Sequence, residues 1–202
     1  MLIVGGNQSA TGGYNVDNSL LLDRASGAKI TNTFGSTTNR RTFTVSLWTK
    51  KNNTTQEQNL VFAGDVQGSN PFFDFRFNSD QTVNWYQSDS SGSGAEFNLI
   101  TNRKFTDPNA WYHIVMAVDT TQGTSSNRVK LYVNGVQQTS LSTATYPSQN
   151  FDTAFNLINF ESQYGGLRTS TPTYDGYICE VVLIDGQQLD PTSFGEFDED
   201  SG

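Results

Sequence analysis

The stretch NWYQ contains the residue types best suited to binding a sugar, an aromatic pair flanked by amides. Trp85 and Tyr86 stand between Asn84 and Gln87, directly before the polar loop 88–94. An aromatic ring can stack on the face of a sugar, while amide groups exchange hydrogen bonds with its hydroxyls. Because alternate residues of a strand face opposite sides, one ring of the pair should face the core and the other should point outward. The alternative is that both rings pack between two sheets.

Two other ring-bearing residues are further candidates. Tyr164 lies in QYGG, which has the composition of an exposed aromatic turn and could extend a ligand-binding surface. His113 is the one histidine, and in the run WYHIVMAVD it shares a face with Trp111 and Val115. A histidine there could act as a general base. We expect instead that its ring fills the inside of a sandwich and donates one hydrogen bond.

Three aspartates in turn-like contexts, Asp65, Asp80 and Asp175, are candidate metal ligands. Calcium takes six to eight oxygen ligands, carboxylates among them, but none of these loops has the spacing of an EF-hand. Each aspartate is equally well explained as a turn residue, because Asp bonds to its own backbone. The sequence therefore predicts no cofactor, with calcium as the alternative.

Catalytic constellations are missing from the sequence. There is no Gly-x-Ser-x-Gly motif, and one cysteine and one histidine are too few for a zinc site built of such ligands. Glycoside hydrolysis needs two carboxyl groups across the scissile bond. Asp74 stands alone between phenylalanines, and Glu180 is isolated on an apolar strand. We therefore predict that the protein is not an enzyme and assign no catalytic residue.

The charge and hydropathy patterns exclude two classes of partner. The 202 residues carry a net charge of −8, and the few lysines and arginines are scattered. Because a nucleic-acid groove needs clustered positive charge, we expect no nucleic-acid partner. No apolar run approaches the roughly 18 residues that span a bilayer, so we expect no membrane insertion.

Strand-length segments with two-residue alternation recur along the chain, separated by clusters of Gly, Asn, Asp and Ser. No window keeps a helical apolar pattern for more than two turns. Strands in this number pack as two antiparallel sheets, so the predicted fold class is all-β, a β-sandwich or jelly roll. The predicted strands are 19–22, 28–33, 42–49, 59–63, 72–77, 82–87, 95–100, 111–119, 128–133, 136–139, 154–159 and 177–184.

Turn chemistry adds local detail. Asn134-Gly135 accepts two positive φ angles and predicts a type I′ hairpin. Asp107-Pro108 and Asp190-Pro191 predict short helical turns, with Asp as the cap and Pro at the first position.

We expect one folded domain over residues 19–198. Residues 1–18 are predicted to be a flexible or partner-bound arm, and their Leu2-Ile3-Val4 could add a strand to a neighbour. Residues 199–202 are predicted to be an acidic tail that joins the domain to further sequence.

Four motifs occur in order: RTFTVSLWTKK, DPNAWYHIVMAVDTT, RVKLYVNGVQ and YDGYICEVVLIDGQQLDPTSFGEFDEDSG. Together they resemble the laminin G-like, concanavalin A-like jelly-roll family over about residues 19–198. Trp111 and His113 match its W-x-H strand, and residues 131–135 match its L-Y-(V/I)-(N/D)-G hairpin. The endings IDGQQLDPTSFGEFDEDSG and DPNAWYHIV are similar to such domains in structural proteins of marine tailed bacteriophages. The family's calcium-ligand motif is not recognisable here.

The resemblance implies a module displayed on the surface of a phage particle, as capsid decoration or in a tail fibre. Its expected partners are host-surface glycans, neighbouring virion proteins or further copies of the chain. One alternative is a free, extracellular, calcium-dependent carbohydrate-binding lectin. The less favoured alternative is a glycoside hydrolase or depolymerase, because paired carboxylates are missing.

Overall fold

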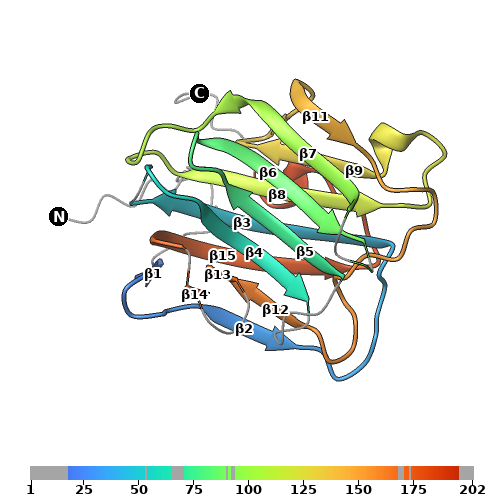
Figure 1. The fold of residues 1–202 in the computed structure, drawn as a ribbon, viewed down its shortest axis with the longest axis horizontal. Helices are drawn as coiled ribbons and strands as arrows, with labels where there is room; N and C mark the ends of the chain where they lie inside the picture. The colour runs from blue at the N-terminus through green and yellow to red at the C-terminus, as the bar shows by residue number, and fades with distance from the viewer. Residues whose placement is uncertain are drawn as a thin grey trace, which may run out of the picture.

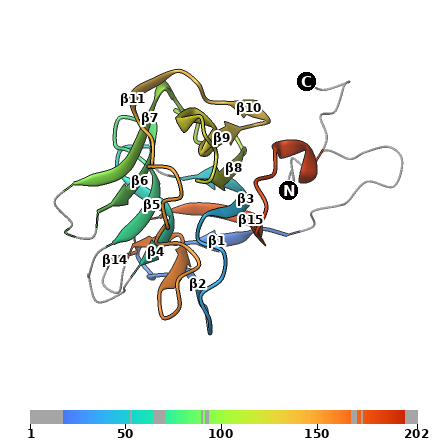
Figure 2. The same cartoon turned by 90° about the vertical axis from the view of Figure 1, so that its right-hand side faces the viewer.

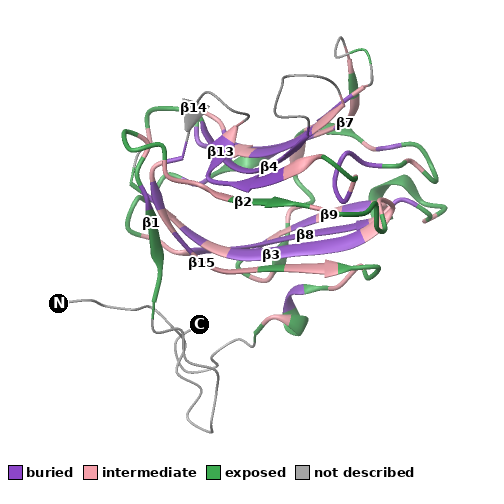
Figure 3. Cartoon of the chain, turned by 90° about the horizontal axis from the view of Figure 1, so that it is seen from below, coloured by how far each residue is buried: buried purple, intermediate pink, exposed green. Residues whose placement is uncertain are grey.

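The computed structural model describes residues 18–52, 54–64, 71–89, 91, 94–167, 171–172 and 174–195. Two antiparallel sheets face each other (Figures 1 and 3), so the predicted all-β sandwich is confirmed. No helix in this part of the chain has the length and apolar character needed to cross a membrane. Asp65, residues 1–17 of the predicted arm and the tail 199–202 lie outside the described residues.

The six-stranded sheet is built from both ends and the middle of the chain. Its spatial order is β1 (Leu20–Leu22), β15 (Gly176–Asp185), β3 (Thr42–Lys51), β8 (Tyr112–Asp119), β9 (Val129–Val133) and β10 (Val136–Gln137). Along β15 the register shifts between Cys179 and Val182, where Glu180 takes a φ of 49°. This β-bulge explains why a glutamate is tolerated on an otherwise apolar strand.

The seven-stranded sheet carries on its outer face the candidate functional site described below. Its spatial order is β11 (Leu141–Thr145), β7 (Ala95–Lys104), β6 (Thr82–Ser88), β5 (Phe72–Phe77), β4 (Gln58–Gly64), β12 (Glu161–Tyr164) and β2 (Ile30–Thr33). The remaining elements are a two-stranded ladder, β13 (Gly166–Leu167) with β14 (Thr171–Pro172), and the 3-10 turns η1 (Ser125–Asn127) and η2 (Pro191–Ser193).

Aromatic side chains fill the space between the sheets, as expected from alternation along strands with a buried face. Phe73 is fully buried and packs edge-to-face with the rings of Trp85, Phe97 and Phe155. Phe43 from the six-stranded sheet stacks on Phe155 at 4.9 Å between ring centroids. The core therefore joins both sheets and fixes which side of each strand faces inward.

The predicted strand at 154–159 is wrong. These residues form turns, and Asn156 and Asn159 have φ angles of 59° and 65°, far from those of a regular strand. The apolar signal came from Ala154 and Phe155, which are buried as a plug at one end of the core. The short strands β11 to β14 were not predicted.

The turn predictions have mixed outcomes. Asn134 and Gly135 both have positive φ, as the type I′ hairpin requires. Asp190 caps η2 by accepting a hydrogen bond from the backbone N–H of Thr192 at 3.0 Å. Residues 107–110 form a turn without a helix, in which the Asp107 carboxylate accepts from the N–H of Asn109 at 2.7 Å.

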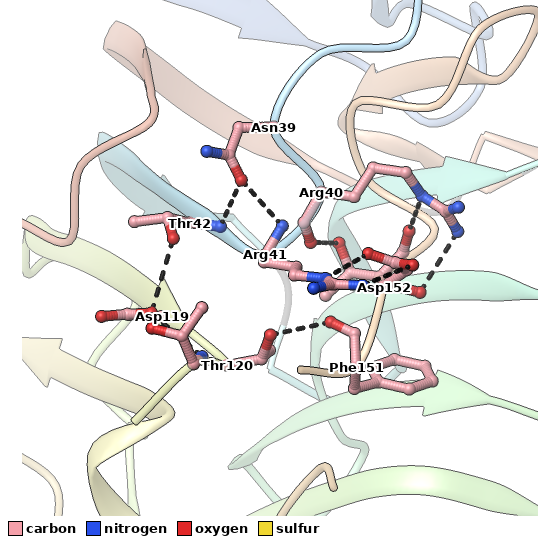
Figure 4. Close-up of polar contacts among 10 residues, drawn as sticks. Asn39, Arg40, Arg41, Thr42, Asp119, Thr120, Phe151 and Asp152 are labelled. Carbon is pink, nitrogen blue, oxygen red and sulfur yellow. Dashed lines mark hydrogen bonds and ion pairs between the residues drawn. The ribbon is translucent and has the colours of Figure 1, made fainter. Parts of the chain in front are cut away.

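Loops at one end of the sandwich are tied together by side-chain contacts (Figure 4). Arg41 forms an ion pair with Asp152 at 2.7 Å, and Arg40 donates to the carbonyl of Thr153 at 2.7 Å. Nearby, the hydroxyl of Thr120 donates to the carbonyl of Phe151 at 2.8 Å. These contacts hold the 150–157 segment against β3 and β8, which keeps the Phe155 plug in place.

The C-terminal segment covers the outer side of the six-stranded sheet, where η2 lies beside β3 and β15 (Figure 2). The Thr44 hydroxyl donates to the carbonyl of Gln187 at 2.7 Å and accepts from the N–H of Leu189 at 2.8 Å. The ring of Phe194 meets that of His113 edge-on. His113 is thus buried on the outer side of its sheet, and its predicted place between the sheets is wrong.

Candidate functional site

The outer face of the seven-stranded sheet gathers polar and aromatic side chains. Since Phe73, Phe75 and Phe77 face the core, Asp74 and Arg76 must point the other way. The same alternation applies on the neighbouring strands. We define the outer face by its residues Asn59, Phe62, Phe72, Asp74, Arg76, Asn84, Tyr86, Asn98 and Gln163.

Strand register lines these residues up in rows. Asp74 on β5 lies opposite Phe62 on β4 and Tyr86 on β6. Tyr86 in turn pairs with Asn98 on β7, and Phe62 pairs with Gln163 on β12. One row therefore crosses five strands, with a carboxylate at its centre, a ring on each side, and an amide beyond each ring.

A second row runs beside the first. Arg76 on β5 lies opposite Asn59 on β4 and Asn84 on β6. Asn59 and Asn84 are buried, whereas Arg76 is partly exposed. The Nδ2 group of Asn84 donates to Oδ1 of Asn98 at 2.6 Å, which links the two rows.

Asp74 is the electrostatic centre of the outer face. Its Oδ1 accepts from Asn59 Nδ2 at 2.7 Å, and its Oδ2 binds Arg76 NH1 at 2.7 Å. The Arg76 guanidinium also lies 3.3 Å from a carboxylate oxygen of Glu57. Complete burial raises the Asp74 pKa to about 6, although Arg76 and the Asn59 hydrogen bond act in the opposite direction. The sequence suggested that Asp74 stands alone, because phenylalanines flank it. In the structure it contacts Asn59 and Arg76 from the same face of the sheet.

Three aromatic rings lie next to one another on the outer face, and that of Phe62 is buried. The Phe72 ring lies 6.1 Å from that of Phe62 and 5.7 Å from that of Tyr86, measured between centroids. Tyr86 is half-buried, and its hydroxyl donates to the carbonyl of Gly94 at 3.0 Å. This bond ties the end of the 88–94 loop to the sheet and holds the Tyr86 ring in one orientation.

Three buried amide oxygens on the outer face lack a hydrogen-bond partner among the described residues: Asn59 Oδ1, Asn84 Oδ1 and Gln163 Oε1. Buried polar atoms are nearly always paired, so each exception calls for an explanation. All three are acceptors on one face of one sheet. A ligand that supplies hydroxyl donors would satisfy them.

The sequence-predicted ligand residues divide between the two sides of the sheet. Asn84 and Tyr86 lie on the outer face. Trp85 is 0 % exposed and packs against Phe97 in the core, so it presents no ring face to a ligand. Gln87 also points inward, where its Oε1 accepts from the backbone N–H of Ala154 at 3.0 Å.

Tyr164 does not lie in an exposed turn. It ends β12, where the hydrogen-bonded ladder to β2 and β4 buries it in the core, and burial raises its pKa to about 12. The turn begins one residue later, at Gly165 with a φ of 82°. Its neighbour Gln163, on the opposite side of the strand, is the residue that reaches the outer face.

Seven members of the outer face were not predicted as ligand-binding residues: Asn59, Phe62, Phe72, Asp74, Arg76, Asn98 and Gln163. Their strands alternate, so each sequence segment indicates which residues share a side. What it does not indicate is which side meets the other sheet. The clustering depends on the register between strands, which joins residues as distant in sequence as Phe62 and Gln163.

The candidate metal ligands do not come together. Among the described residues no group of three His, Cys, Asp or Glu side chains is placed to hold a metal ion. Asp80 accepts hydrogen bonds from the N–H and hydroxyl of Thr82, at 3.1 and 2.7 Å, which lower its pKa. Asp175 lies 3.4 Å from the Asn52 amide. The contacts of Asp80 are thus those of a turn residue, whereas Asp175 contacts Asn52 and Gln58, which are distant in sequence.

Several solved structures have a fold similar to that of this chain. The chain is similar to domain 4 of AbnA, a GH43 extracellular arabinanase from Geobacillus stearothermophilus solved with arabinotriose, at 20% identity and a TM-score of 0.59 over 85% of this chain and 72% of that chain. It is also similar to the CBM40 of the Ruminococcus gnavus IT-sialidase bound to α2,3-sialyllactose, at 15% identity and a TM-score of 0.56 over 83% and 96% of the two chains. A third similar structure is the heptameric SAP-like pentraxin of Limulus polyphemus, at 13% identity and a TM-score of 0.51 over 76% and 68%.

A search of curated protein sequences gives no match. The family model of a laminin G group, described as the concanavalin A-like lectin/glucanases superfamily, matches residues 23–190. The match spans most of the chain and both sheets, in agreement with the resemblance drawn from the motifs. The chain belongs to the concanavalin A-like lectin/glucanases superfamily.

Proposed function

We propose that this domain is a non-catalytic carbohydrate-binding module and that its ligand lies on the outer face of the seven-stranded sheet. The observation that carries the proposal is the set of three buried, unpartnered amide oxygens on Asn59, Asn84 and Gln163. Sugar hydroxyls are donors of the kind these acceptors need. The Tyr86 ring, half-buried on the same strand as Asn84, supplies a surface on which a sugar ring stacks.

Family membership supports this function, and so do two similar structures, one solved with arabinotriose and the other with α2,3-sialyllactose. A sandwich fold hosts many functions, so it is the residues of the outer face, and not the fold, that favour glycan binding. The rigid sheet would hold the ring and the amides in fixed positions, which reduces the entropy lost on binding.

The environment of Asp74 supports a binding role over glycan cleavage. A general acid must bring its proton within hydrogen-bond reach of the leaving oxygen. Both Asp74 oxygens are already held, by Asn59 and Arg76, and its side chain is 1 % exposed. We propose that Asp74 orders the amides around it and does not react.

A binding experiment with a matched pair of variants tests the proposal. The domain would be screened on a glycan array, and each hit would be measured by calorimetry. Tyr86→Ala should weaken binding about fivefold or more, since loss of an aromatic ring that stacks on a nucleic-acid base costs about 1–3 kcal/mol and we expect a similar cost for a sugar. Tyr132→Ala removes an equally half-buried ring from the outer side of the six-stranded sheet and should leave affinity unchanged. Equal loss in both variants, or no bound glycan at all, would contradict the proposed site.

We further propose that the module is displayed on a phage virion, where it binds host-surface glycan or neighbouring virion proteins. The support for this setting is the similarity of DPNAWYHIV and IDGQQLDPTSFGEFDEDSG to domains of phage structural proteins. Mass spectrometry of purified particles should find the chain at a fixed copy number. Its absence from washed particles would contradict the virion setting and leave glycan binding to be judged separately.

A further inference from the structure

The three unpartnered atoms on the outer face have the same chemical character. Each is a carbonyl oxygen, on Asn59, Asn84 or Gln163, and each accepts but does not donate. No buried side-chain donor of this face is left unpaired among the described residues. The outer face therefore presents an excess of acceptors to whatever lies on it.

The orientation of two of these amides is fixed by carboxylates. Asn59 Nδ2 donates to Asp74 Oδ1 at 2.7 Å, and Gln163 Nε2 donates to Glu161 Oε1 at 2.7 Å. Turning either amide over would place its oxygen against a carboxylate oxygen, which is repulsive. The free atom at Asn59 and at Gln163 is therefore the oxygen, whatever the ambiguity of amide orientation elsewhere.

The positive charges next to these acceptors are already neutralised. Arg76 binds Asp74 at 2.7 Å and lies 3.3 Å from Glu57. Lys29, beside Gln163, lies 3.9 Å from the carboxylate of Glu161. An incoming anion would have to compete with these carboxylates for each cation, and would lose its own hydration in doing so.

We propose that the outer face selects neutral, hydroxyl-rich sugars and discriminates against their carboxylated counterparts. This inference rests on the proposed glycan-binding function and adds the chemical class of the ligand. A neutral sugar brings hydroxyl donors to Asn59, Asn84 and Gln163. A sugar carboxylate brings more acceptors to a surface of acceptors, and faces the negative charges of Glu57 and Glu161, while Arg76 and Lys29 beside them are already paired with carboxylates. Specificity of this kind comes from repulsion as much as from attraction.

The test compares neutral oligosaccharides with carboxylated ones. Lactose and α2,3-sialyllactose form one pair, and arabinotriose and a galacturonic acid trimer supply a neutral and an acidic alternative. Calorimetry on the full chain, at 150 mM salt and pH 7.5, measures each affinity. Neutral sugars should bind, and the acidic sugars should bind at least tenfold more weakly.

Two variants separate the charge effect from simple loss of binding. Glu57→Gln relieves Arg76 of one carboxylate, so it should strengthen binding of the acidic sugars severalfold and leave the neutral sugars within twofold. Glu180→Gln removes the same charge from the six-stranded sheet and should change neither class. Gln163→Met keeps the length of the side chain, removes the acceptor oxygen, and should weaken neutral binding about tenfold, as loss of a hydrogen bond does. Thermal melting of each variant verifies that it is folded.

The outcomes distinguish the inference from the function on which it rests. Acidic sugars bound as tightly as, or more tightly than, neutral sugars would overturn the inference and leave glycan binding intact. Neutral binding unaffected by Gln163→Met would also overturn it, because the acceptor would then have no role. Binding of neither class would overturn the proposed function together with this inference.

Discussion

The imidazole of His113 stacks on the indole of Trp48, with ring centroids 4.8 Å apart and ring planes at 21°. Its Nε2 atom lies 2.9 Å from the hydroxyl of Ser46, and the ring of Phe194 closes the remaining side. The imidazole is therefore enclosed by two aromatic rings and a neutral hydroxyl on the outer side of the six-stranded sheet. This setting favours the neutral form of histidine.

The first prediction is that His113 stays neutral well below its usual pH range. Burial lowers its pKa from 6.5 to about 4. Between those values the unfolded chain binds a proton that the folded chain does not, so the free energy of unfolding should fall as the pH drops from 6.5 to 4. The loss is at most about 3 kcal/mol from this group. Because the chain has one histidine, a single NMR resonance reports the titration directly.

His113→Gln supplies the control for this experiment. The variant should lose the part of the pH dependence that lies between pH 4 and 6.5, whatever its stability at neutral pH. An imidazole that titrates near 6.5 in the folded protein would contradict the enclosed geometry.

The second prediction concerns Asp74 and has the opposite sign. Its pKa is raised from 3.8 to about 6 by burial, so the folded chain binds a proton that the unfolded chain has already released. The free energy of unfolding should therefore fall as the pH rises from 4 to 6, and should then level off. Urea unfolding of the wild type and of Asp74→Asn across this range isolates the contribution of Asp74. A difference between the two that does not change with pH would contradict the raised pKa.

The sequence predicted those features of the fold that depend on residues close together in the chain, and missed those that depend on pairing between distant strands. Alternation predicted Phe73, Phe75 and Phe77 on one side of their strand, and Asn134-Gly135 predicted its hairpin, because both signals are local. The short strand at Glu161–Tyr164 was missed because its place is set by pairing with β4 and β2, from distant parts of the chain. The strand predicted at 154–159 is wrong because Ala154 and Phe155 are apolar and buried but lie in a turn, in which Asn156 has a positive φ.

The site was less predictable than the fold, for a related reason. The NWYQ motif lies on a strand that contributes Asn84 and Tyr86 to the outer face, and alternation required that one of Trp85 and Tyr86 face outward. Which of them does so is decided by pairing with β5, where Phe75 faces the core opposite Trp85. The amides of Asn59 and Gln163 join Asn84 only through the ladder of strands between them, which no segment of the sequence shows by itself.

The third prediction follows from the opposite orientations of Trp85, which faces the core, and Tyr86, which faces outward. Trp85→Ala should lower the free energy of unfolding by about 3–5 kcal/mol, because it leaves a cavity among Phe73 and Phe97. Tyr86→Ala should cost stability far less, because its half-buried ring lies outside the core. Urea unfolding measures the stability of both variants. A larger stability loss in Tyr86→Ala than in Trp85→Ala would contradict the assignment of the two sides.

The fourth prediction concerns Lys51, which is fully buried at one end of the core. Its Nζ donates to Oε1 of Gln81 and to the carbonyl of Phe105, both at 2.6 Å, and lies 4.3 Å from the centre of the Phe77 ring. These partners are neutral, so burial lowers the Lys51 pKa from 10.5 to about 8. Above pH 8 the folded chain releases a proton that the unfolded chain keeps. The free energy of unfolding should therefore rise with pH between 8 and 9.5.

Lys51→Met separates this effect from the titration of other groups. Methionine has a similar length and fills the same space, but it leaves the two oxygens that Lys51 satisfied without a donor. The variant should therefore be less stable than the wild type above pH 8, and the difference should grow up to pH 9.5, where neutral lysine still donates a hydrogen bond. Urea unfolding at pH 7, 8, 9 and 9.5 measures both chains. A stability difference that stays constant over this range would mean that Lys51 remains charged when buried, and that the carbonyl of Phe105, Gln81 and the Phe77 ring compensate fully for its lost hydration.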